Sequence, residues 1–241
     1  MPELPEVETV RRVLEMQIQG LAVESLTVGR PEVVAHPTAE AFCSGVVGRS
    51  FVRIDRRGKF LLFMLDDGGH IVLHLRMTGC LLLAPADAPP EKHTHLTFRL
   101  SGGRELRFSD VRRFGRVWLL EKDEADSYSG VEKLGPEPFS DLTAGYLADR
   151  LGKRRKAVKE FLLEQSVIAG IGNIYADEIL FAAQIGPSRA ACSLTGAEWA
   201  LQVYGKAGEP CPVCGEPLCR KVIGGRGSTY CPHCQREEKA D

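Results

Sequence analysis

The sequence predicts an α+β protein of several domains, in which an N-terminal helix leads into an antiparallel β-sandwich, followed by a helical domain and a small hairpin. Three observations predict this arrangement. Between about residues 21 and 120, short apolar or alternating runs are separated by Gly, Pro and Asp, as is typical of a sandwich or barrel. Beyond residue 140, apolar residues recur at helical spacing. Near the C-terminus, Gly, Pro and Cys become frequent.

The first helix is expected directly behind the N-terminus. Apolar residues recur there at helical spacing: Val7, Val10, Leu14 and Ile18. Gly20 ends the pattern. In the strand-rich part that follows, DDGG at 66–69 and SGG at 101–103 are typical of hairpin turns. Together these elements form the first predicted domain, residues 1–130.

A Pro- and Gly-rich connector, LGPEPFS, separates this domain from the next. We assign residues 131–139 to the linker and residues 140–204 to a helical domain. Asp141 is a suitable N-cap for the first helix of that domain, and Asn173 opens a later helix, NIYADEIL. Residues 205–236 form the third predicted domain.

Composition bounds the function classes. The 44% hydrophobic fraction is ordinary for a globular protein, and no apolar run approaches the length of a membrane span. The N-terminus is acidic and lacks an apolar signal core, so we expect a cytoplasmic protein. A net charge of −1 argues weakly against nucleic acid, but Lys and Arg cluster at 49–59, 104–116 and 150–159. Each cluster is either a solvated face or part of an electrostatic footprint for nucleic acid.

The cysteines indicate a metal site. Four of the eight form the pattern C-x2-C-x16-C-x2-C: Cys211, Cys214, Cys231 and Cys234. Two such pairs supply four thiolates in a tetrahedron, the usual ligand set of Zn²⁺, and leave no open position for catalysis. We therefore predict one structural Zn²⁺. Cys43, Cys80 and Cys192 are expected to be small core residues.

The opening residues, MPELPEVETVRR, allow unusual chemistry. A small residue behind the initiator Met normally permits its removal, which would leave Pro2 as a terminal secondary amine. An α-amine titrates near pH ~8, so it can attack an electrophilic carbon and form an iminium. Glu3 and Glu6 are three apart and can share one face of the helix start. A plain helix start, with Pro in the first turn and acids near the positive end of the dipole, accounts for the same residues.

Six separated stretches, in order along nearly the whole chain, carry a family resemblance: PELPEVETVRR, RRGKF, HLRMTG, RRFG, AGIGNIYADEILF and the C-terminal cysteines. They resemble formamidopyrimidine-DNA glycosylases, bacterial base-excision enzymes that remove oxidised purines. The resemblance implies a two-layered β-sandwich, a helix–two-turn–helix DNA-binding element and a zinc finger. It also implies a monomer that acts on double-stranded DNA containing an oxidised base or an abasic site.

The resemblance implies catalytic roles for residues of the first domain. Pro2 matches the nucleophile of the family, and Glu3 matches its acid/base group. Lys59, in RRGKF, matches a lysine that contacts the DNA backbone and assists proton transfer. We group Glu6 with them as a second carboxylate. The implied reaction is base displacement by Pro2, followed by β- and then δ-elimination of the phosphates.

Three residues match the wedges that fill the gap left when a base is flipped out of the stack: Met77, Arg112 and Phe114. Arg112 can also hydrogen-bond the orphaned partner base. By periodicity alone, Met77 would be a core residue. Val111 precedes this arginine where the family commonly has Pro.

Three further residues are grouped as DNA contacts. His74 lies in HLRMTG, on the strand before the wedge turn. Asn173 matches a residue that binds a phosphate near the damage, a role compatible with capping its helix. Arg226, in the turn of the C-terminal hairpin, matches an arginine that grips the phosphate beside the lesion.

The resemblance breaks between about Ser193 and Val203. The family normally carries a further long helix there, and a loop that closes over the flipped base, so we predict an internal deletion. Two alternatives stay open. An endonuclease VIII-like enzyme would act on oxidised pyrimidines, although its family has Gly where Leu4 stands. A damaged-DNA-binding protein would have lost turnover with the missing segment.

Overall fold

A computed structural model describes residues 1–138, 140, 142–151, 154–183, 185–194, 208–211, 213–223 and 226–233. The chain divides into two compact units. The first comprises Met1–Gly135 and the short segment Ala169–Gly172, and the second comprises Pro136–Ile168 and Asn173–Asp241. A segment remote in sequence therefore completes the first unit.

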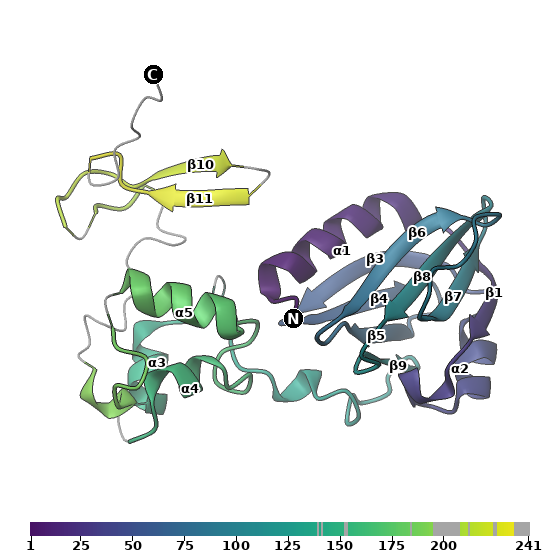
Figure 1. The fold of residues 1–241 in the computed structure, drawn as a ribbon, viewed down its shortest axis with the longest axis horizontal. Coiled ribbons are helices and arrows are strands. Elements are labelled where there is room, and N and C mark those ends of the chain that lie inside the picture. The colour runs from purple at the N-terminus through teal and green to yellow at the C-terminus, as the bar shows by residue number, and fades with distance from the viewer. Residues whose placement is uncertain are drawn as a thin grey trace. The chain divides into compact units, whose positions relative to one another are not determined.

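Two β-sheets form the body of the first unit (Figure 1). One has the order β1 (Val23–Val28), β7 (Thr94–Leu100), β8 (Arg104–Asp110), β6 (Gly79–Pro85). The other has the order β2 (Val34–His36), β9 (Arg116–Leu120), β5 (His70–His74), β4 (Phe60–Leu65), β3 (Phe51–Arg57). Neighbouring strands run antiparallel, except that β2 and β9 run parallel. The predicted antiparallel sandwich is confirmed, with one parallel pair at a sheet edge.

Apolar side chains from both sheets share one core. The Phe51 ring comes from the five-stranded sheet and the Phe98 ring from the four-stranded sheet. The two rings pack in an edge-to-face arrangement, with centroids 6.4 Å apart. Such a pair adds directional preference to the burial of apolar area. Cys80 lies on the outward side of β6 and is exposed, and Cys192 is exposed as well. The expectation that these two cysteines belong to the core is therefore wrong, because strand alternation turns Cys80 away from it.

Helices flank the sheets. The first unit contains α1 (Leu4–Ile18), η1 (Pro31–Val33), α2 (Ala39–Val46) and η2 (Val131–Lys133). The predicted amphipathic N-terminal helix is confirmed, since α1 buries Leu4, Val7, Leu14 and Ile18. Gly20 follows its end with a φ of 80°, a left-handed conformation that glycine adopts without strain.

Both predicted hairpin turns are present. Residues 66–69 join β4 to β5, and residues 101–103 join β7 to β8. Gly68 and Gly102 have φ values of 92° and 91°, respectively. Glycine in a left-handed conformation thus allows each tight hairpin turn, and the turn fixes the register of the two strands it joins, as the sequence predicts.

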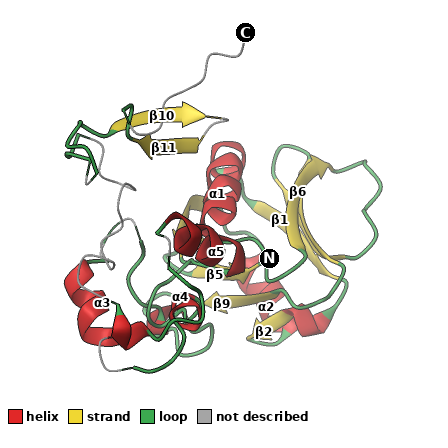
Figure 2. Cartoon of the chain, turned by 60° about the vertical axis from the view of Figure 1, so that its left-hand side comes forward, coloured by secondary structure: helices red, strands yellow, loops and turns green. Residues whose placement is uncertain are grey.

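The second unit contains short helices and a hairpin (Figure 2). The helices are α3 (Ala144–Leu151), α4 (Val158–Leu162), α5 (Asn173–Ala182) and η3 (Ala191–Ser193). Asp141, the predicted cap, lies outside the described residues; the Thr143 hydroxyl accepts a hydrogen bond from the Tyr146 N–H at 3.1 Å. As expected, Asn173 begins its helix. None of the helices in the described ranges is long and apolar enough to cross a bilayer.

The hairpin consists of β10 (Cys219–Ile223) and β11 (Arg226–Tyr230), paired antiparallel. Its register runs from Cys219 opposite Tyr230 to Ile223 opposite Arg226. The predicted C-terminal hairpin is therefore present.

Candidate active site

The start of α1 buries a carboxylate. Glu3 is the N-cap residue and only 2% exposed, while Pro2 before it is half-buried. Glu3 and Glu6 form a capping box, in which the Glu3 backbone N–H donates to Glu6 Oε2 at 3.0 Å. The Glu6 side chain therefore holds the backbone of Glu3, and the Glu6 backbone N–H donates to the Glu3 side chain.

Residues 169–172, from the AGIG motif, pack against this helix start. The Leu4 N–H donates to the Gly170 carbonyl at 3.1 Å, and the Gly172 N–H donates to Glu3 Oε2 at 2.7 Å. A Cβ at Gly172 would lie 2.4 Å from the carboxyl carbon of Glu3, closer than any side chain tolerates. Glycine is needed at 172 because the backbone itself touches the carboxylate.

Lys59 reaches the same segment from the turn between β3 and β4. Its side chain is 4% exposed, and its Nζ donates to the Ile171 carbonyl at 2.8 Å. Burial lowers the pKa of Lys59, and the opposite charge of Glu3 counteracts part of that shift. The lysine is thus a buried amine near a buried carboxylate, a combination typical of functional sites.

One peptide group lies between these charges. The Ile171 carbonyl accepts from Lys59 and the Gly172 N–H donates to Glu3, and the two belong to the same peptide bond. The negative end of its dipole therefore faces the ammonium and its positive end faces the carboxylate. Both charges are stabilised by hydrogen bonds after their removal from water. This peptide sets the positions of both groups.

His74 ends β5 beside this cluster and is 6% exposed. Burial lowers its pKa to about 3, and the charges of Arg76 and Lys59 act in the same direction. Its Nδ1 accepts from the Arg76 N–H at 2.9 Å. The imidazole is therefore neutral near pH 7 and carries its proton on Nε2, which makes Nε2 a hydrogen-bond donor.

The three predicted wedge residues lie on exposed turns. Met77, between β5 and β6, is 44% exposed, and Phe114, between β8 and β9, is 47% exposed. The expectation from periodicity that Met77 belongs to the core is wrong. The Arg112 guanidinium lies 5.0 Å from the centre of the Phe114 ring, a cation–π contact. Large side chains presented in this way are available to an external partner.

The remaining predicted DNA contacts belong to the second unit. Asn173 is exposed at the first residue of α5, where the backbone N–H groups of a helix favour an anion. Arg226 begins β11, but its side chain lies outside the described part of the chain.

The clustered basic residues are partly neutralised within the fold. Arg107 is 1% exposed and donates to the carbonyls of Ala88 and Pro89 at 2.6 and 2.9 Å. Arg56 donates to Glu8 at 3.0 Å, and Arg57 donates to the Gly135 carbonyl at 2.7 Å. Clusters read from sequence therefore overstate the basic surface, because several members are structural.

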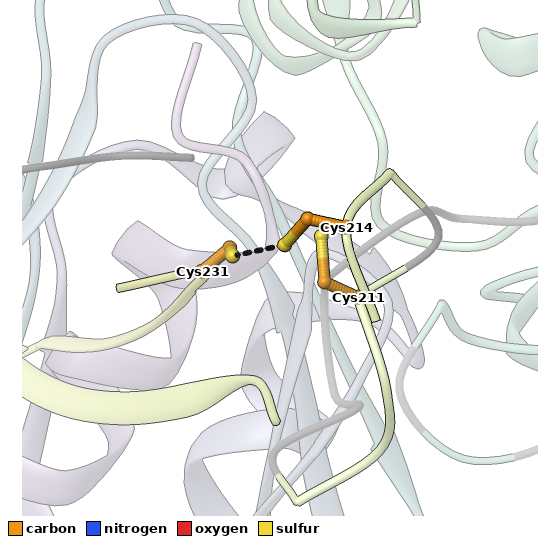
Figure 3. A group of neighbouring side chains, drawn as sticks. All are labelled: Cys211, Cys214 and Cys231. Carbon is orange, nitrogen blue, oxygen red and sulfur yellow. Dashed lines mark hydrogen bonds between the residues drawn. The ribbon is translucent and has the colours of Figure 1, made fainter. Parts of the chain in front are cut away.

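The C-terminal cysteines converge (Figure 3). The sulfurs of Cys211, Cys214 and Cys231 lie within 4.8 Å of one another, and those of Cys214 and Cys231 are 3.5 Å apart. Backbone N–H groups of Cys214 and Val213 lower the pKa of Cys211 to about 7, which favours the thiolate. Three convergent sulfurs fit the ligand set of a structural Zn²⁺. The fourth predicted ligand, Cys234, lies outside the described residues.

Sequence reasoning missed two features of the first unit, one beside Glu3 and Lys59 and one beneath the turn of Arg112 and Phe114. The Ile171–Gly172 peptide acts through its backbone, so only the glycines of AGIG hinted at a close approach. The buried carboxylate of Asp110 accepts the N–H groups of Arg112 and Gly115. An aspartate at the start of a turn often binds the backbone two residues ahead, and that signal would have identified it.

Family models match the chain in three parts. Residues 1–117 match the formamidopyrimidine-DNA glycosylase N-terminal domain, and residues 134–204 match the H2TH domain of the same proteins. Residues 208–236 match a zinc finger found in FPG and IleRS. The three matches follow the order of the elements described above.

Curated and solved relatives agree with these matches. The formamidopyrimidine-DNA glycosylase of Pelotomaculum thermopropionicum is 40% identical over 274 residues, covering 98% of this chain and 99% of the relative. Two structures of Lactococcus lactis FPG, bound to DNA with a Fapy-dG or an abasic site, are 36% identical with a TM-score of 0.78. Each match covers 98% of this chain and 100% of the other. The 274 aligned positions exceed the 241 residues of this chain by 33, in keeping with an internal deletion.

Proposed function

The chain belongs to the formamidopyrimidine-DNA glycosylase family, and we propose that it is a bifunctional DNA glycosylase and AP lyase of base-excision repair. Its substrate is double-stranded DNA that contains an oxidised purine or an abasic site, in the bacterial cytoplasm. The observation that carries the proposal is the buried pair of Glu3 and Lys59, held on the two ends of one peptide group.

Pro2 is the nucleophile in this proposal. Once Met1 is removed, the free secondary amine attacks C1′ of the damaged nucleotide, and the glycosidic bond breaks with its electron pair leaving on the base. Opening of the sugar ring, with protonation of O4′, converts the adduct into an iminium. The iminium acidifies the C2′ hydrogens, so loss of a C2′ proton expels the 3′ phosphate and a second elimination expels the 5′ phosphate. Hydrolysis then frees Pro2.

Glu3 moves the protons of these steps. Its carboxylate lies one residue beyond the nucleophile, and its position is fixed by the Gly172 N–H at 2.7 Å. General acid–base catalysis needs a group held within hydrogen-bond reach of the reacting oxygen. We propose that Glu6 acts by positioning, through its bond to the Glu3 backbone. The lowered pKa of the buried Lys59 amine suits it to proton transfer, and in its ammonium form it contacts the DNA backbone in this proposal.

The exposed turns carry the side chains that extrude the base in this proposal. Met77, Arg112 and Phe114 present apolar and planar groups that can occupy the gap left by a flipped base. His74, a neutral Nε2–H donor, and Asn173, at a helix N-terminus, bind phosphates beside the lesion. Arg226 on the zinc hairpin completes these contacts. Zn²⁺, held by Cys211, Cys214, Cys231 and Cys234, would fix the hairpin and take no part in the chemistry.

A second candidate function is damage recognition without turnover. The observation that favours it is the length difference, since the Pelotomaculum alignment contains 33 more positions than this chain has residues. If the missing positions include the cover of the base pocket, the duplex could be bound and the base left in place.

A single-turnover assay on three duplexes tests these functions. We expect excision of an oxidised purine, slower excision of an oxidised pyrimidine, and the fastest strand cleavage at an abasic site, which needs no base recognition. Preference for the pyrimidine would favour the endonuclease VIII-like alternative. Tight binding with no excision and no cleavage would favour the second candidate and overturn the proposal.

A further inference from the structure

One buried carboxylate anchors the 111–115 turn, which carries Arg112 and Phe114. Asp110, the last residue of β8, is fully buried. Its Oδ1 accepts the Arg112 N–H at 3.1 Å, and its Oδ2 accepts the Gly115 N–H at 2.8 Å. Although burial raises the pKa of Asp110, these bonds and the Thr78 hydroxyl lower it overall, so the anchor stays ionised.

The same carboxylate reaches the Met77 turn. The Thr78 hydroxyl donates to Asp110 Oδ1 and also accepts the Arg112 N–H at 3.1 Å. Thr78 directly follows Met77, and Gly79 next to it pairs with Asp110 in the β6–β8 ladder. The hydroxyl therefore bridges the two turns, although the turns are more than thirty residues apart in sequence.

Packing beneath the turns reinforces this bridge. The Phe108 ring is fully buried, and it underlies Gly79, where β6 leaves the Met77 turn, and Gly115, the last residue of the other turn. A Cβ would lie 2.9 Å from the Phe108 ring at Gly79 and 2.5 Å from it at Gly115. Both turns thus rest on one aromatic ring, and neither can shift without disturbing that contact.

The backbone of Asp110 is fixed from its other side. Its carbonyl accepts from His95 Nε2 at 2.7 Å, and its N–H donates to the His93 carbonyl at 3.1 Å. The anchor is therefore part of the rigid sandwich, whereas the wedge side chains it holds are exposed.

We propose that Thr78 and Asp110 are positioning residues that join Met77, Arg112 and Phe114 into one wedge of fixed spacing. This inference rests on the wedge role assigned under the proposed function. Base extrusion needs all three side chains to enter the stack together, so an independent movement of either turn would slow extrusion. The covalent steps at Pro2 begin after extrusion and do not depend on the bridge.

The test is Thr78→Val in the full-length protein, since Val keeps the shape and removes the hydroxyl. Thr78→Ser restores a hydroxyl. Thr38→Val is the matched control. It also removes a threonine hydroxyl, one that caps a helix by accepting the Ala41 N–H at 3.3 Å, at a position far from both turns in sequence. Extrusion is followed by the fluorescence of 2-aminopurine placed next to the lesion, and excision is measured on a paired duplex and on one whose lesion lies in an unpaired bubble.

We expect Thr78→Val to slow extrusion and excision on the paired duplex about tenfold, the rate equivalent of one lost hydrogen bond to a charged group. On the bubble, where the base is already unstacked, the change should be less than about twofold. Thr78→Ser should recover most of the rate, and Thr38→Val should not reproduce the defect.

Extrusion at the wild-type rate in Thr78→Val would overturn the proposal, and so would an equal loss on both substrates. The fluorescence signal reports extrusion even if no base is released. A failure of the Pro2 chemistry would therefore abolish excision in every variant and still leave the extrusion rates to judge the bridge.

Discussion

The proposed catalytic cluster and the proposed wedge turns present their side chains in opposite ways. Glu3 and Lys59 are 2% and 4% exposed, and each is held by one end of the Ile171–Gly172 peptide. Met77 and Phe114 are 44% and 47% exposed, and the bonds that fix their turns lie beneath them at Asp110. In the first region the proposed acid–base groups are themselves buried and hydrogen-bonded. In the second, only the anchor is buried.

The difference fits the roles proposed for the two regions. Acid–base groups gain strength where water is excluded and their geometry is fixed, so their burial is part of the chemistry. Wedge groups must leave water for a base stack, so they have to be accessible before DNA binds. A change in the first region should therefore act on rate, and a change in the second should act on extrusion and binding with little effect on stability.

The largest effect is expected for Gly172→Ala. The new Cβ would lie 2.4 Å from the Glu3 carboxyl carbon, so the carboxylate must move, and a displacement of about 1 Å can cost roughly 100-fold in rate. Gly186→Ala is the matched control, because a Cβ there meets no atom of the described residues within 4 Å. Single-turnover excision measures both. Equal rates for the two variants would show that the peptide does not position Glu3.

The second prediction concerns pH and stability. The pKa of His74 is about 3 in the fold and near ~6.5 in the unfolded chain, so the unfolded chain binds the proton first as pH falls. His74 therefore leaves the free energy of unfolding unchanged well above pH ~6.5. As pH falls towards 3, protonation stabilises the unfolded chain, and the free energy of unfolding drops by about 2 kcal/mol between pH 7 and pH 5.

His74→Asn tests this prediction, because Asn keeps an acceptor for the Arg76 N–H and does not titrate. Urea unfolding at pH 7 and pH 5 should show a smaller loss of stability for the variant than for the wild type. His70, whose pKa is also lowered by burial, is present in both proteins and cancels in the comparison. An equal loss in the two proteins would contradict a neutral, buried His74.

Alanine at both Arg112 and Phe114 should weaken binding to a lesion duplex about tenfold, because the cation–π pair and its stacking surface are lost. The melting temperature should change by less than about 2 °C, since exposed side chains contribute little to folding. Met77→Ala should also weaken binding to the lesion duplex. Met16→Ala is its matched control and should not, because Met16 is an exposed methionine on α1, 84% exposed, outside the wedge turns. A large loss of stability in the double variant would assign Phe114 to the core.

Zinc removal should have the smallest effect on binding. In the described part of the hairpin domain only Cys211, Leu218 and Cys231 form a buried apolar cluster, too little to fold without metal. Chelation should unfold the hairpin and weaken lesion-DNA binding about fivefold through loss of one phosphate contact. Cys214→Ser should behave likewise, whereas Cys80→Ser, at an exposed thiol outside the hairpin, should not. Normal binding by the chelated protein would contradict a structural role for the metal.

The same two regions show what sequence reasoning can reach. Alternating runs and Gly-rich turns predict the strands on either side of 66–69 and 101–103, because period and turn chemistry are local properties. The contact of Lys59 with Ile171 spans 112 residues and uses a backbone carbonyl, so no side-chain pattern announces it. Arg107 shows the converse failure, since a basic cluster in sequence gives no sign that one member is buried against carbonyls.

Borohydride trapping tests the central claim, that the Pro2 amine reacts with C1′. The mature protein should lack Met1, and reduction on a lesion duplex should yield a stable protein–DNA adduct that peptide mapping places at Pro2. Pro2→Gly keeps a terminal amine and should trap weakly, while retention of Met1 or blocking of the amine should abolish the adduct. An adduct that forms with the amine blocked, or one that maps to Lys59, would contradict the Pro2 mechanism.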